Sequence, residues 1–118
     1  MKIGDTYFYK DGGHLWIVIS DPQTHGGALV AVNITTDEFR AGKECMLEVG
    51  DHKWVTKKSF VSFGDAMKLE PEHVANLEKA ISSGKVGQHF PMKDEVLKKI
   101  VTAAAASTAL SPEFKKFL

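Results

Sequence analysis

The stretch HLWIVISDPQTHGGALVAVNITT (residues 14–36) contains the two apolar runs that decide the fold. LWIVI and ALVAVNI are nearly continuous and rich in β-branched residues, so they predict strands that are covered by protein on both faces. Between them, Asp21-Pro22 and Gly26-Gly27 predict a turn. We therefore expect two central strands, at residues 14–20 and 28–35, around which the other elements pack.

Residues 1–69 as a whole have the pattern of a small all-β unit. They are rich in β-branched and aromatic residues, and Gly, Asp, Asn or Pro interrupts them about every 8–12 residues. Further strands are expected at residues 5–10, 45–49, 53–55, 59–63 and 66–69. The first of these alternates, with Tyr7 and Tyr9 on one side, and is predicted to be an edge or half-buried strand.

The pattern becomes helical after Leu69. Pro71 suits a first helical position and Gly84 a stop, with the apolar positions between them at helical spacing. A second helix is expected over residues 93–106, and a short terminal one begins at Ser111-Pro112. The sequence thus predicts a single α+β domain over residues 1–118, with a small barrel in residues 1–70 and a helical part in residues 71–118 packed against it.

Composition excludes some classes of function. Fifteen basic residues balance fifteen acidic ones, which argues against a strongly basic nucleic-acid coat. Fourteen of the basic residues are lysines and one is Arg40, so a polyanion site must rely on Lys, His and backbone donors. The only cysteine, Cys45, allows no internal disulfide and is expected in the core. With no apolar run of about 20 residues and no signal-peptide pattern, the chain is expected to be cytoplasmic, without a membrane partner.

Several segments resemble the MazF/PemK-like toxins, which are small SH3-like barrels. The matching pieces are Gly4-Asp5 before an aromatic strand, HLWIVIS (residues 14–20), VNITT (residues 32–36), and GDHKW followed by KKSFVSF (residues 50–63). The resemblance covers roughly residues 3–70. It implies a cytoplasmic toxin that cleaves single-stranded RNA, forms a homodimer and is blocked by an antitoxin protein.

Two positions of the family's site can be matched to residues of this sequence. The family threonine at the end of the third strand matches Thr35, with Thr36 beside it. Family members have a catalytic arginine just before the second strand, and His14 stands at that place here. Any chemistry at this site is therefore expected to use different groups from those of the typical members.

Histidines offer that chemistry, because metal-independent RNA cleavage needs a base for the 2′-hydroxyl proton and an acid for the leaving 5′-oxygen. We expect His14 and His52 to move protons, together with Thr35 at the catalytic centre. Substrate phosphates are expected to meet the side chains of Thr36, Lys57, Lys58 and Ser59. The chain lacks metal-ligand motifs, a phosphate loop and a dinucleotide fingerprint, so no cofactor or metal is expected.

Two alternatives stay open. A non-catalytic SH3-like module could bind protein or nucleic acid through exposed aromatics and the C-terminal helices. A thiol hydrolase based on Cys45 is the more distant alternative. The remaining histidines, His25, His73 and His89, are expected at the surface.

Overall fold

β3 (Leu29–Thr35) is buried at every one of its seven residues and lies inside the sheet, between β2 (Leu15–Val18) and β5 (Ser59–Leu69). The computed structural model describes residues 1–118 and has six strands in the order β4-β5-β3-β2-β1-β6, all paired antiparallel. The outer strands are β4 (Met46–Leu47) and β6 (Val86–His89), and β1 (Thr6–Tyr9) pairs with both β2 and β6.

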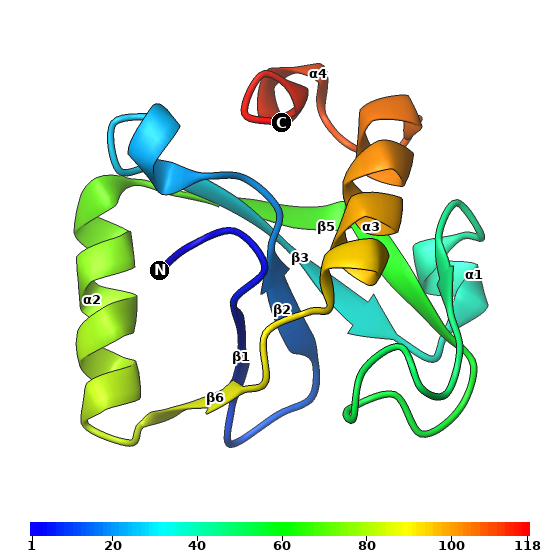
Figure 1. Cartoon of the computed structure of the whole chain (residues 1–118), viewed down its shortest axis with the longest axis horizontal. Coiled ribbons are helices and arrows are strands. Elements are labelled where there is room, and N and C mark those ends of the chain that lie inside the picture. Colours follow the sequence, from blue (N-terminus) through cyan, green and yellow to red (C-terminus); the bar gives the residue numbers. More distant parts are fainter.

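Helices lie around this sheet (Figure 1). The longer two are α2 (Pro71–Ser82) and α3 (Asp94–Ala106). Short helices occur at η1 (Pro22–Thr24), α1 (Glu38–Ala41) and α4 (Pro112–Lys115). None of the helices is long and apolar enough to cross a membrane.

Two apolar clusters sandwich the sheet, because successive side chains of a strand point to opposite faces. On one face, Ile17 and Val32 pack with Ile100 of α3 in a cluster of sixteen buried residues. On the other face, Val18 and Ala31 pack with α2 in a cluster of seven. α2 and α3 therefore cover opposite faces, as their places on the two sides of the strands in Figure 1 illustrate.

The α+β architecture and the main helices agree with the sequence prediction, and the short terminal helix has Ser111 as its N-cap. Cys45 is buried in the larger cluster, as expected, and burial raises the pKa of its thiol. The sheet is open, because its hydrogen-bonded order ends at β4 and β6. The predicted strand at residues 53–55 is wrong, since Trp54 donates its backbone N–H to the His52 side chain rather than to a neighbouring strand.

β5 joins two segments that were predicted as separate strands. Its pairing with β3 shifts register between Ala31 and Asn33, where Ala31 faces Met67 but Asn33 faces Ser62. The extra residues of β5 form a bulge that contains Gly64 and Asp65. Such irregularities redirect side chains, and here the Asp65 carboxylate turns back to accept a hydrogen bond from Ser62 Oγ.

β6 was not predicted. It makes β1 an interior strand, so of the two alternatives predicted for β1 the edge is wrong, while its half-buried pattern is confirmed. Its sequence VGQH has little apolar alternation, so only the pairing with β1 reveals it. Gly87 lies against the ring of Phe8, and a Cβ atom at this position would overlap the ring. Phe8 in turn packs on Trp54, with ring centroids 5.1 Å apart. Gly87 therefore permits β6, Phe8 and Trp54 to pack in one layer.

Replacing Gly87 with alanine tests this layer. We expect Gly87→Ala to lower the free energy of unfolding by about 1–3 kcal/mol, because the methyl group must displace the Phe8 ring. Chemical denaturation monitored by tryptophan fluorescence would measure the loss. Gly12→Ala is the matched control, since a Cβ there meets nothing within 4 Å. Equal stability of the two variants would contradict the proposed packing.

Candidate nucleic-acid site

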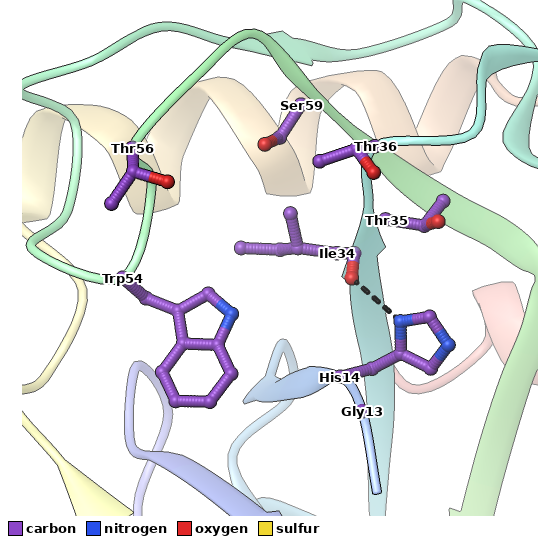
Figure 2. A pocket seen from close by; sticks show the side chains of 8 residues that line it. All are labelled: Gly13, His14, Ile34, Thr35, Thr36, Trp54, Thr56 and Ser59. Carbon is purple, nitrogen blue, oxygen red and sulfur yellow. Dashed lines mark hydrogen bonds between the residues drawn. The ribbon is translucent and has the colours of Figure 1, made fainter.

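A recess opens where β2 begins and β3 ends, and it contains four of the seven site residues predicted from sequence. Its lining comprises Gly13, His14, Ile34, Thr35, Thr36, Trp54, Thr56 and Ser59 (Figure 2). The recess has a volume of about 200 Å³. Pockets for enclosed small molecules typically have roughly 300–1,000 Å³, so this recess suits one part of an extended ligand.

His14 is half-buried and held in one orientation. It directly precedes β2, and the pairing of Leu15 with Ile34 brings it beside the end of β3. Its Nδ1 lies 3.1 Å from the Ile34 carbonyl oxygen, which can only accept, so Nδ1 carries the proton. In the neutral ring Nε2 is then a free acceptor. Figure 2 shows Nε2 on the side of the ring that faces away from Trp54.

The hydroxyl groups of the recess differ in what they can donate. Thr35 Oγ1 accepts a hydrogen bond from the backbone N–H of Asp37, at 3.1 Å, so its own hydrogen remains available for a ligand. Ser59 Oγ instead donates to the Lys57 carbonyl, at 2.9 Å, and can offer a ligand only an acceptor while that bond persists. Thr36 and Thr56 are exposed at the rim. Thr56 is not among the residues predicted from sequence, although it directly precedes the predicted lysine pair.

His52 does not line the recess. It is only 5% exposed, and both of its ring nitrogens are used. Nε2 donates to the carbonyl of Phe90, at 2.6 Å, and Nδ1 accepts the backbone N–H of Trp54, at 3.0 Å. Burial lowers the pKa of His52, because the cation is poorly solvated there. The structure thus places His52 where it joins the Trp54 segment to the chain after β6.

Trp54 forms the wall of the recess opposite His14 (Figure 2). Its indole packs on Phe8 and, edge to face, on His89, with ring centroids 6.0 Å apart in the second pair. Of the three histidines predicted at the surface, His73 is exposed, whereas His25 and His89 are half-buried. Sequence alone did not distinguish Trp54 from the core aromatics, because its position depends on His52 and on the unpredicted strand β6.

Lysines flank the recess without acidic partners. Lys57 and Lys58 are exposed and belong to the segment between Thr56 and Ser59. Neither is among the four ion pairs of the structure, which involve Met1, Arg40, Lys43 and Lys68 as the cations. Lys53 lies with its Nζ 4.8 Å from the centre of the Phe90 ring. Unpaired cations at a rim attract polyanions over a range of about 10 Å at moderate salt.

No group of three or more His, Cys, Asp or Glu side chains is placed to hold a metal ion. The arrangement instead combines one imidazole with a free nitrogen, several hydroxyls, an indole wall and unpaired lysines at the rim. In comparisons with known proteins, no family model and no curated protein matches this chain.

The structural position of His52 predicts a pH dependence of stability. The pKa of His52 is lower in the folded chain than in the unfolded one. The stability that this difference provides is therefore fully present above the pKa of the unfolded chain, about 6.5. As the pH falls below that value, the unfolded chain takes up a proton that folded His52 resists, and the free energy of unfolding decreases. Denaturation of wild type and His52→Gln across pH 5 to 8 would measure the difference.

We expect the slope below about pH 6.5 to be smaller in His52→Gln than in wild type. His73→Gln, which changes an exposed histidine of α2, provides the control and should keep the wild-type slope. An unchanged slope in His52→Gln would show that the buried ring is not the titrating group.

Proposed function

We propose that this protein is an endoribonuclease of the MazF/PemK-like kind, which cleaves single-stranded RNA at the His14–Thr35 recess without a metal ion. The observation that supports the proposal best is the pairing of a proton acceptor with a hydroxyl donor. His14 has Nε2 free and Thr35 has its hydroxyl hydrogen free, at the ends of adjacent strands. The sequence resemblance supports the same family and includes the finer expectation of an SH3-like barrel.

In this mechanism His14 acts as the general base. Nε2 takes the proton of a ribose 2′-hydroxyl, and the 2′-oxygen then bonds to the adjacent phosphorus as the bond to the 5′-oxygen breaks. The products are a 2′,3′-cyclic phosphate and a 5′-hydroxyl, whose proton comes from water. The imidazolium afterwards returns its proton to water. Thr35 donates to a phosphate oxygen and so stabilises the charge that grows in the transition state.

The surroundings of His14 and Thr35 suit the rest of the RNA strand. An unpaired base can stack on Trp54, on the side of the His14 ring opposite Nε2 (Figure 2), since stacking on an aromatic ring needs no particular sequence. Thr36 and Ser59 would contact the sugar or phosphate, and Lys57 and Lys58 would attract the backbone. His52 keeps Trp54 in place instead of moving protons, because neither of its nitrogens is free.

Substitution of His14 tests the proposal. We expect His14→Ala to reduce cleavage of a labelled single-stranded RNA about 10²–10⁴-fold, the usual contribution of general acid–base catalysis. Thr35→Val should also reduce cleavage, and a chelator should leave the wild-type rate unchanged. His73→Ala, at an exposed position of α2, should cleave like wild type. Equal activity of His14→Ala and wild type would refute the assignment.

A second candidate function follows from the single proton-transfer group in the recess. With one histidine there, rather than the two expected, the recess also suits a module that binds RNA without cutting it. Wild-type protein that binds single-stranded RNA but leaves it intact would favour this alternative.

The proposed partners and location rest on the resemblance: a homodimer, an antitoxin protein that blocks the recess, and a cytoplasmic site of action. A dimer of this chain should elute with twice the mass of 13.0 kDa in size-exclusion chromatography with light scattering. A monomer at all accessible concentrations would contradict the expected homodimer.

A further inference from the structure

The only arginine of the chain lies on the sheet face that His14 Nε2 adjoins. Arg40 is in α1, just after the end of β3. Its Nε donates to Asp65 Oδ2 at 3.0 Å, and the same oxygen accepts from Ser62 Oγ at 2.7 Å. No hydrogen bond of the structure uses the two Nη groups of Arg40, whose side chain is 53% exposed.

A short chain of hydrogen bonds connects Arg40 to the recess. Thr35 Oγ1 accepts the N–H of Asp37, and the Asp37 carboxylate in turn accepts the backbone N–H groups of Phe39 and Arg40. Thr35, which would donate to a phosphate, therefore also holds Asp37, the N-cap residue of α1. This motif directs Arg40 back over β5 instead of outward.

Strand pairing places the side chains of His14, Thr35 and Ser62 on one face of the sheet, together with that of Asn33. Asn33 pairs with Trp16 on one side and Ser62 on the other, and paired residues point to the same face. Thr35 shares that face with Asn33, because the two residues are two apart in β3. His14 precedes Trp16 by two positions and lies on the same side. The pKa of Asp65 is lowered chiefly by the Ser62 hydrogen bond and then by Arg40, with a smaller Coulombic effect of nearby His14, which agrees with this proximity.

The same face contains an unsatisfied polar group. Asn33 is only 3% exposed, and its Oδ1 has no hydrogen-bond partner. A buried polar atom without a partner is costly, so an apolar residue would serve stability better at this position. Asn33 therefore makes the strip of the sheet between Trp16 and Ser62 polar, at the expense of packing.

We infer that Arg40 is the phosphate-binding cation of this site, with its Nη groups binding the RNA phosphate beside His14 while Asp65 holds its Nε. This inference rests on the proposed function. Arg40 would supply from α1 the guanidinium that the resembling family has just before the second strand. An exposed ion pair such as Arg40–Asp65 contributes little to stability, so its removal should affect RNA and leave folding nearly unchanged.

Two assays on single-stranded RNA test the role of Arg40. The first measures cleavage of a 20-nucleotide RNA, and the second measures binding of the same sequence with 2′-O-methyl groups, which lacks the attacking hydroxyl. We expect Arg40→Ala to lower kcat/KM about ten- to a hundredfold, as for a lost hydrogen bond to a charged group. It should also reduce the slope of log affinity against log salt concentration by about 0.7 in magnitude, which is the value for one phosphate contact to a single strand.

Arg40→Lys separates geometry from charge. Lysine keeps the charge but not the forked donors, so it should restore the salt slope and only part of the cleavage rate. Lys43→Ala is the matched control, because Lys43 follows α1 closely, is similarly exposed and pairs with Glu38. It should behave like wild type in both assays. Thermal unfolding of all variants would show whether any effect arises from folding.

The outcomes distinguish this inference from the proposed function. If wild type cleaves, His14→Ala does not, and Arg40→Ala matches wild type in rate and salt slope, the role of Arg40 is refuted and the nuclease remains. If wild type binds without cleaving and Arg40→Ala flattens the salt slope, the nuclease fails but Arg40 still binds phosphate. If wild type neither binds nor cleaves, both are refuted.

Discussion

Burial of β3 on both faces is the constraint on which the other parts of the structure depend. All seven of its residues are shielded from solvent, by α3 on one face and by α2 over part of the other. A slip of one residue in its pairing would move Asn33 and Thr35 into the cluster under α3. The same slip would remove Val30, Val32 and Ile34 from that cluster. The loss of this apolar packing fixes the register, and with it the point at which the strand ends at Thr35. The candidate site lies at that point.

The site is assembled by packing between distant segments. His14 comes from the start of β2, Thr35 from the end of β3, and Trp54 from a loop that forms no strand. Trp54 depends on His52, which is bonded to Phe90, and on Phe8, whose ring occupies the space that Gly87 leaves free. The far edge of the sheet thus supports one wall of the recess. A change in β6 would reach the site through Phe8 and Trp54.

The helices and strands that were predicted correctly are those whose ends or apolar runs are marked by residues within the same segment. Pro71 and Gly84 bound α2 because proline fits a first turn and glycine accepts the positive φ, 80°, that ends this helix. The apolar runs before and after Gly26-Gly27 identified β2 and β3. β6 was missed because its four residues owe their strand conformation to β1 alone, and residues 53–55 were misassigned because a histidine side chain takes the hydrogen bond that a strand would use.

The α+β class, the two central strands, the helices after Leu69, and the placement of His14 and Thr35 at strand ends follow from the amino-acid sequence, because apolar spacing and turn residues act over short distances. Which of these side chains meet depends on the three-dimensional packing of the chain. This packing put His52 in a structural pair of hydrogen bonds, left His14 Nε2 free, and turned Arg40 onto Asp65 across 25 residues of chain. The reason is physical: a side chain's partners depend on strand register and on the bulge in β5, which no local pattern encodes.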